Sequence, residues 1–76
     1  MNYEDAMVLV TEGKVVTCDN LEWDYVAMDV TQIGVVIGLP LLRYRDGISI
    51  GKYEPSDNEK NASDWREHII IPFDYN

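Results

Sequence analysis

The stretch Arg43–Tyr53, RYRDGISIGKY, carries the clearest structural signal in the chain. Two runs of strand-forming residues flank Asp46-Gly47, a pair favoured in two-residue type I′ hairpins because both positions need a positive φ. Such a turn would place Arg45 opposite Ile48 in an antiparallel pair. An antiparallel hairpin is therefore the predicted centre of the fold.

The two faces of this hairpin are expected to differ in character. Tyr44 should lie opposite Ser49, on the face that also carries Leu42, Gly51 and Tyr53. Gly51 has no side chain, which leaves room for another backbone or a flat ligand. The other face is expected to hold three cationic side chains and two isoleucines: Arg43, Arg45, Lys52, Ile48 and Ile50. Half of the six lysines and arginines would thus lie on one hairpin.

The residues before the hairpin predict a helix followed by strands. Asn2 is a good N-cap, Gly13 is placed to close the helix, and Tyr3–Glu12 carries apolar residues at helical spacing. Three later runs have the β-branched content or the alternation of strands: Lys14–Cys18, Tyr25–Val30 and Gln32–Gly38. In the second run, Val26, Met28 and Val30 are expected on one face.

The residues after the hairpin predict a second, short helix. Ser56-Asp57-Asn58-Glu59 fits the S-x-x-E capping box, and the helix should end by Ala62. Trp65–Pro72 then reads as a final strand. The predicted fold is a single α+β domain over residues 1–76, with the N-terminal helix packed on a small antiparallel sheet and the second helix before the last strand.

Size and composition bound what the chain can be. The 46% hydrophobic content excludes intrinsic disorder, and no apolar run approaches the roughly 20 residues that a membrane span needs. Glu4 and Asp5 stand where a secretory signal would be basic, so a cytoplasmic location is expected. A core this small only marginally offsets the entropy of folding, which favours self-association.

The charge balance limits the possible partners. Fourteen acids against six bases give a net charge of -8, which opposes binding to nucleic acid or an anionic membrane. An acidic protein that inhibits a host defence protein, or mimics nucleic acid in a basic groove, is the alternative function to be weighed. A lone Cys18 and a lone His68 predict no metal site, no cofactor and no nucleophilic triad. No catalytic residue is predicted, and an enzyme is the weakest class.

Residues 53–65, YEPSDNEKNASDW, indicate a preference for donor-rich ligands. Glu54, Asp57 and Glu59 surround the helix N-terminus, where they disfavour phosphate and favour a ribose hydroxyl or a base amino group. Trp65 is expected to anchor this turn from behind as a core residue. Trp23 differs, because it lies in the polar connection CDNLEWD and could serve as a stacking platform.

Several segments occur in the order found in a known family. These are NYEDAMVLVTEGKVV, then Trp23, then LPLLRYRDGISIGKYEPS, and finally ASDW, which ends at Trp65. In that order they resemble the second type of Thoeris anti-defence protein, a family of small phage proteins, over about residues 2–66. The chain departs from the family pattern at Tyr53, where tryptophan is usual, and before Trp23, where the family is more basic.

The resemblance implies a non-enzymatic sponge in the cytoplasm of the host cell. Such proteins form homo-oligomers, typically a dimer of dimers, and sequester cyclic ADP-ribose isomers or cyclic dinucleotides without cleaving them. We therefore expect aromatic residues to stack on bases, Ser56 and Asp57 to contact polar edges, and hairpin arginines or Lys14 to neutralise phosphate. The expected ligand-binding residues are Trp23, Tyr25, Arg43, Tyr53, Pro55, Ser56 and Asp57.

Overall fold

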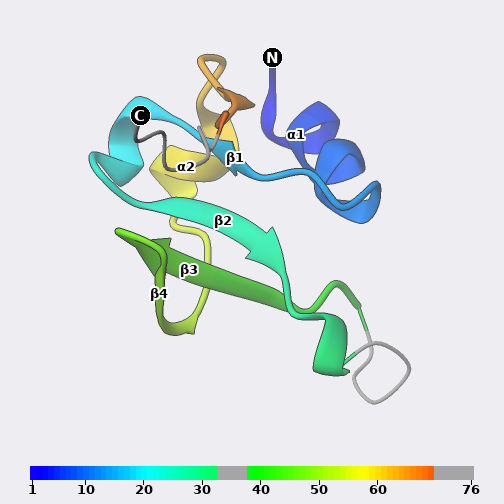
Figure 1. Cartoon of the computed structure of the whole chain (residues 1–76). Helices are drawn as coiled ribbons and strands as arrows, with labels where there is room; N and C mark the ends of the chain where they lie inside the picture. Colours follow the sequence, from blue (N-terminus) through cyan, green and yellow to red (C-terminus); the bar gives the residue numbers. More distant parts are fainter. Residues whose placement is uncertain (33–37, 70–76) are drawn as a thin grey trace, which may run out of the picture.

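A computed structural model describes residues 1–32 and 38–69 and shows an α+β fold, as predicted (Figure 1). Two α-helices, α1 and α2, and two 3₁₀ turns, η1 and η2, accompany one antiparallel sheet of order β4-β3-β2-β1-β5. In chain order the elements are α1 (Tyr3–Thr11), β1 (Val16–Thr17), η1 (Asp19–Leu21), β2 (Tyr25–Met28), η2 (Val30–Gln32), β3 (Leu41–Arg45), β4 (Ile48–Lys52), α2 (Asp57–Asn61) and β5 (Arg66–Glu67). Within the described ranges, no helix is long and apolar enough to cross a membrane.

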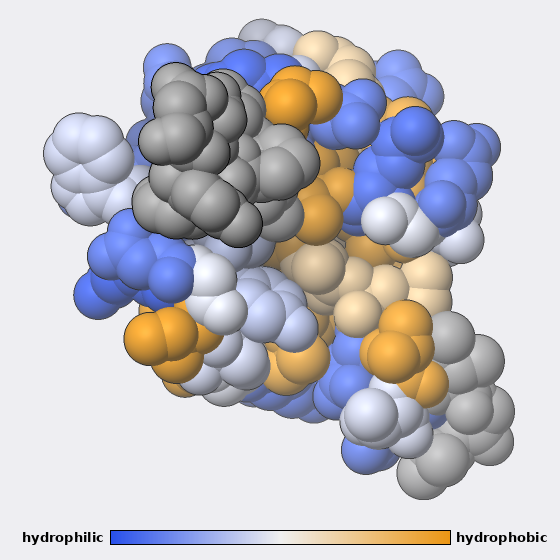
Figure 2. Space-filling model, viewed as in Figure 1, coloured by the Kyte–Doolittle hydropathy of each residue, from blue (hydrophilic) through white to orange (hydrophobic). Residues whose placement is uncertain are grey.

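The core lies between α1 and one face of the sheet. Val16 of β1 and Val26 of β2 are paired and fully buried, and α1 places Ala6 and Val10 against this face. Burial of these side chains gives the short helix the packing energy that it lacks alone. The core cluster consists of Ala6, Val10, Val16, Cys18, Leu21, Val26, Leu41, Tyr53 and Trp65. Partly buried residues extend it into the apolar band between α1 and the sheet in Figure 2.

Both predicted helix caps are confirmed. The Asn2 side chain accepts a hydrogen bond from the Asp5 backbone N–H at 2.8 Å, and Gly13 follows the helix with φ 86°. At α2, Ser56 Oγ accepts from the Glu59 N–H and Glu59 Oε1 accepts from the Ser56 N–H, both at 3.3 Å. The capping box therefore satisfies two donors of a helix only five residues long.

The hairpin turn is confirmed, but a β-bulge corrects the predicted faces. Asp46 and Gly47 have φ values of 53° and 82°, and Arg45 lies opposite Ile48 as expected. Tyr44 lies opposite Ser49, yet the next pair is Arg43 with Gly51, so Ile50 is an extra residue in β4. Everything after Ile50 is consequently shifted by one position.

Because of this shift, the prediction that Lys52 shares a face with the arginines is wrong. Lys52 lies opposite Leu42, and the two line the same hollow beside η2. Gly51 lies opposite Arg43 rather than on the face of Leu42. The cationic side chains of the hairpin are thus divided between its two faces.

The run Tyr25–Val30 is a shorter strand than predicted. Asp29 Oδ1 accepts hydrogen bonds from the Thr31 backbone N–H at 3.1 Å and from its hydroxyl at 2.6 Å. This local turn competes with the sheet and starts η2. Val30 is therefore exposed instead of lying on the buried face with Val26.

The remaining strands are also short in the described part of the chain. The run Lys14–Cys18 contains only Val16–Thr17 as strand, and Trp65–Pro72 contains Arg66–Glu67, with residues 70–72 outside the described ranges. Of the predicted strand Gln32–Gly38, Gln32 belongs to η2 and Gly38 to a bend, and residues 33–37 lie outside the described ranges.

Candidate functional site

Trp23 is the most exposed large hydrophobic side chain among the described residues, with 82% of its surface accessible. It stands on a tight turn between two buried residues, Leu21 and Asp24. The Asp24 N–H donates to the Leu21 carbonyl at 3.0 Å, and Glu22 adopts a positive φ of 58°. The indole thus projects from a backbone that is fixed on both sides.

Two acidic side chains lie beside this indole. Asp19, Glu22 and Trp23 line an open hollow of about 280 Å³. An aromatic face beside carboxylates can stack on a base and accept hydrogen bonds from its amino group or from a ribose hydroxyl. None of the described residues that line the hollow is cationic, and its two carboxylates disfavour a phosphate.

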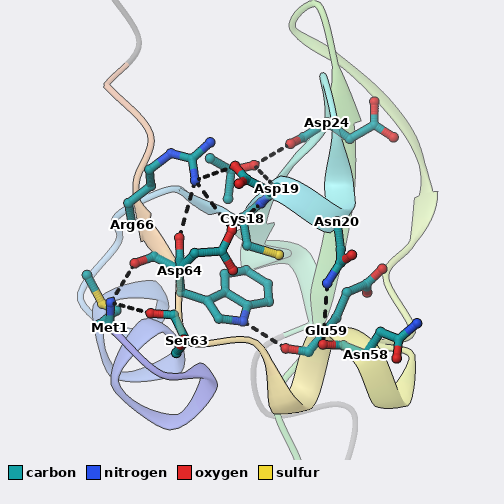
Figure 3. A network of polar contacts seen from close by, with 12 residues as sticks. Met1, Cys18, Asp19, Asn20, Asp24, Asn58, Glu59, Ser63, Asp64 and Arg66 are labelled. Atoms are coloured by element: carbon teal, nitrogen blue, oxygen red, sulfur yellow. Dashed lines mark hydrogen bonds and ion pairs between the residues drawn. The ribbon is translucent and has the colours of Figure 1, made fainter.

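The loop that carries Trp23 is tied to the segment before β5 (Figure 3). Asp64 Oδ2 accepts a hydrogen bond from the Asp19 backbone N–H at 2.8 Å, and Arg66 donates to Asp19 Oδ1 at 3.1 Å. On the other side, the Asn20 side chain donates to the Asn58 carbonyl of α2 at 3.4 Å. The aspartate of the ASDW motif therefore holds the base of the Trp23 loop.

Trp65 anchors the same region from within the core, as predicted. Its side chain is 1% exposed, and its indole N–H donates to the Glu59 carbonyl at 2.8 Å. Its backbone N–H donates to the Met1 carbonyl at 3.0 Å, and the Met1 ammonium donates to the Trp65 carbonyl at 2.8 Å. The N-terminus, α2 and the start of β5 consequently meet at Trp65, through its backbone and its indole.

A buried carboxylate holds both hairpin arginines. Asp24 Oδ2 accepts from Arg43 Nε at 2.6 Å, while Arg45 donates from Nε to Oδ1 at 2.7 Å and from Nη2 to Oδ2 at 3.0 Å. The bond from Arg45 is the main cause that lowers the pKa of Asp24, with a further contribution from Arg43 and opposition from burial. This cluster stabilises the end of β2 beside the Trp23 turn.

The cluster of Asp24 with the two arginines was not predicted, although the alternation of residues along the strands indicated that Asp24 and Arg43 share a face. Asp24 lies two residues before Val26 and so shares its face of the strand. Val26 lies opposite Arg43 in the register, which brings the arginine to the same face. The register of β2 with β3 could not be known from the sequence without the strand order.

This arrangement limits the phosphate role expected of the arginines. Their two positive charges face one carboxylate, which leaves a single positive charge in excess. Asp46 and Glu22 also lie close enough to raise the pKa of Arg45, after the larger effect of Asp24. Arg43 thus remains near the candidate site, but its Nε donor is already used.

Tyr25 does not fit the expected role in ligand stacking. Its ring is parallel to that of Tyr44, with centroids 5.6 Å apart and an interplanar angle of 4°, and it stacks on His68 at 4.6 Å and 16°. Because both neighbours contact the ring and the residue is buried, its faces are not open to a base. Sequence reasoning missed this aromatic stack, since His68 lies 43 positions away from Tyr25.

Tyr53 also differs from its expected role, because it is a core residue. It is 3% exposed, and its hydroxyl donates to Glu59 Oε1 at 2.7 Å. Burial raises the pKa of the Tyr53 phenol, and the bond to Glu59 raises it further. Tyr53 therefore supports the capping box of α2 from inside and is not a stacking platform.

Replacing Tyr53 by phenylalanine is expected to lower the free energy of unfolding by about 1–2 kcal/mol, because the buried Glu59 carboxylate loses a donor. Urea unfolding followed by circular dichroism measures this. Tyr44→Phe is the matched control and should change the free energy by less than about 0.5 kcal/mol. Equal losses in the two variants would contradict a stabilising bond from Tyr53.

The other expected ligand residues lie at the start of α2. Pro55 is half-buried, whereas Ser56 and Asp57 are exposed. The Ser56 hydroxyl already accepts one hydrogen bond within the capping box, from the Glu59 N–H. Since α2 packs against η1, these residues belong to the element that neighbours the Trp23 loop. None of Pro55, Ser56 and Asp57 lines the Trp23 hollow itself, and the structure places Tyr25 and Tyr53 inside the fold.

A second hollow lies elsewhere on the molecule. It measures about 260 Å³ and lies between η2 and the hairpin, where leucine and proline side chains dominate its lining and Asp29 and Lys52 supply charge. None of the expected ligand residues lines it.

Among residues 1–32 and 38–69, no group of three or more His, Cys, Asp or Glu side chains is placed to hold a metal ion. Cys18 is a free, buried thiol whose pKa is raised by that burial.

Comparison of the chain with protein-family models, with curated proteins and with solved structures found no match.

Proposed function

We propose that this chain is a non-enzymatic, homo-oligomeric sponge that binds a cyclic nucleotide signal of antiphage defence and withholds it without cleavage. The observation that carries the proposal is the exposed indole of Trp23 on a fixed turn beside two carboxylates. The ordered resemblance to Thoeris anti-defence proteins supplies the ligand class, a cyclic ADP-ribose isomer or a cyclic dinucleotide.

Stacking on Trp23 is the first step of the proposed recognition. The backbone turn that carries the indole is already formed, so binding does not need to order this segment of the chain. A base on this surface would have its amino group within the reach of Glu22 or Asp19, which are acceptors only. The acidic surroundings thus favour the base and the ribose over the phosphates.

Phosphate recognition needs a cation beyond the lining of the Trp23 hollow. Asp24, which both arginines hold, directly follows Trp23 in the chain. Arg45 keeps more than half of its side chain exposed, so its guanidinium is accessible to a ligand. We assign the phosphate contact to Arg45, with the remaining donors of Arg43 as its support.

The proposal is tested by incubating the purified protein with cyclic ADP-ribose isomers and cyclic dinucleotides and then measuring the free ligand. Depletion of one ligand, followed by its intact recovery after the protein is denatured, is the expected result. Unchanged concentrations across the panel would contradict nucleotide binding. Recovery of a cleaved product would contradict the sponge mechanism. A stoichiometric host protein in a pull-down, without bound nucleotide, would support the acidic inhibitor instead.

Trp23→Ala is expected to weaken ligand binding about 10- to 100-fold, because a base–aromatic stack contributes roughly 1–3 kcal/mol. Equilibrium dialysis against the ligand found in the panel measures this. Val30→Ala, an exposed apolar residue outside the hollow, is the matched control and should bind like the unmodified chain. Equal binding by both variants would remove Trp23 from the site.

A further inference from the structure

The outer edge of β4 is a surface that the proposed function does not use. β4 is the terminal strand of the sheet, and all five of its residues are exposed. Ile48 and Ile50 expose 67% and 48% of their surfaces. Figure 2 shows apolar surface over this strand, at the lower left. An exposed apolar edge strand is a template for pairing with another strand.

The hairpin geometry determines which backbone groups face outward. In a two-residue hairpin, the residues that flank the turn exchange both backbone hydrogen bonds. Arg45 and Ile48 are this pair, so the N–H and C=O of Ile48 point to β3. The corresponding groups of Ser49 then point away from the sheet. Within the described ranges, no strand pairs with this side of β4.

The side chains along this edge are arranged symmetrically about Ser49. Ile48 and Ile50 lie one residue to either side. A two-fold axis at Ser49 would therefore bring Ile48 of one copy beside Ile50 of the other. Pairing these isoleucines removes exposed apolar surface from water.

A different register loses one of these advantages. An axis at Ile48 would use backbone groups that β3 already occupies, and an axis at Ile50 would lie on the bulged residue, where the strand edge is irregular. The bulge at Ile50 increases the local twist and confines regular pairing to the residues around Ser49. The exposed edge of β4 therefore favours a short antiparallel contact with β4 of a second copy, centred on Ser49.

We propose that β4 is the homo-oligomer contact, at which a second copy of this chain pairs antiparallel with Ser49 on the two-fold axis. The two five-stranded sheets then form one continuous sheet across the pair. The inference rests on the homo-oligomeric part of the proposed function and not on any ligand. It names the surface and the register of one contact.

Cysteine cross-linking tests the register directly. Opposite residues of a hydrogen-bonded pair have Cα atoms about 5.5 Å apart, which suits a disulfide. Ser49→Cys should therefore form a symmetric dimer under mild oxidation. Ile48→Cys is the matched control, because the two copies of position 48 would lie about 8 Å apart, too far for a disulfide. The unmodified chain, which contains only the buried Cys18, shows how much cross-linking occurs without the introduced cysteine.

A mixed experiment separates pairing from random collision. Ile48→Cys and Ile50→Cys should each cross-link poorly alone and should form a heterodimer when mixed, because the proposed register places them opposite each other at about 4.5 Å. We expect cross-linking of Ser49→Cys, and of the mixed pair, at least about 10-fold faster than of Ile48→Cys alone. Equal rates in all samples, or no cross-linking in any, would overturn the proposal.

Sedimentation velocity of the unmodified chain provides the second measurement. A dimer that dissociates on dilution is expected, and Ser49→Pro should reduce it while circular dichroism stays unchanged, since the lost N–H faces outward. A chain that is monomeric throughout, or a dimer that Ser49→Pro leaves intact, would also overturn the proposal. Both readouts are made without nucleotide, so failure of ligand binding does not affect them.

Discussion

Replacing Trp65 by alanine is expected to lower the free energy of unfolding by about 3–5 kcal/mol, a large part of the roughly 5–15 kcal/mol available to a small domain. The indole fills the centre of the core, and its N–H satisfies the Glu59 carbonyl at the end of α2. Its loss leaves a cavity and removes one of the two donors to the Glu59 carbonyl, which then keeps only the Ala62 N–H. Urea unfolding monitored by circular dichroism would show a largely unfolded chain or a strongly reduced transition midpoint.

Trp23→Ala provides the matched control for this prediction. The same side chain is removed, but from a position that is 82% exposed, so the free energy of unfolding should change by less than about 0.5 kcal/mol. The same variant is expected to lose ligand binding. Comparison of the two variants would thus show that Trp65 contributes to stability and that Trp23 contributes to ligand recognition. A comparable loss of stability in both variants would show that the Trp23 turn is structural.

The second large effect is expected at Asp24. Asp24→Asn should lower the free energy of unfolding by about 2–3 kcal/mol, because three hydrogen bonds from Arg43 and Arg45 lose their charged acceptor. Asp46→Asn is the control: this aspartate is exposed, and Asn-Gly suits the same type I′ turn. That control should differ from the parent by less than about 0.5 kcal/mol in urea unfolding. Similar losses in both variants would contradict a specific role of the buried carboxylate.

The same cluster predicts a dependence on pH. The native pKa of Asp24 lies below its unfolded value, chiefly because of the bond from Arg45. Its contribution to stability is therefore complete above about pH 4 and is lost as the pH falls through the native pKa. The difference in the free energy of unfolding between the parent and Asp24→Asn should narrow below pH 4. A difference that stays constant down to pH 2 would contradict this assignment.

Local signals in the sequence predicted the local structures well. Asp46-Gly47 specified the turn because few residues adopt two consecutive positive φ values, and the S-x-x-E pattern specified the cap of α2 because its bonds span only three residues. The α1 boundaries were correct to within one residue for the same reason. In each case the stabilising contacts lie within the segment itself.

The site was predicted less completely because its contacts are distant in the chain. Trp23 was identified, since an aromatic residue in a polar loop is visible in the sequence alone. Tyr25 and Tyr53 cannot be distinguished from Trp23 as aromatic residues in the sequence. In the structure, His68 stacks on the ring of Tyr25, and the hydroxyl of the buried Tyr53 donates to Glu59. Strand alternation also could not reveal the bulge that moves Lys52 to the other face.

The sequence by itself thus determined the α+β class, the hairpin turn, both helix caps and the distinct position of Trp23, because short-range bonds and backbone preferences decide these features. Only the tertiary structure decided that Asp24 binds both hairpin arginines and that Tyr53 is part of the core. It also decided that β4 ends the sheet with Ser49 facing outward. These features depend on strand order and register, which arise from packing between segments that are far apart in the chain.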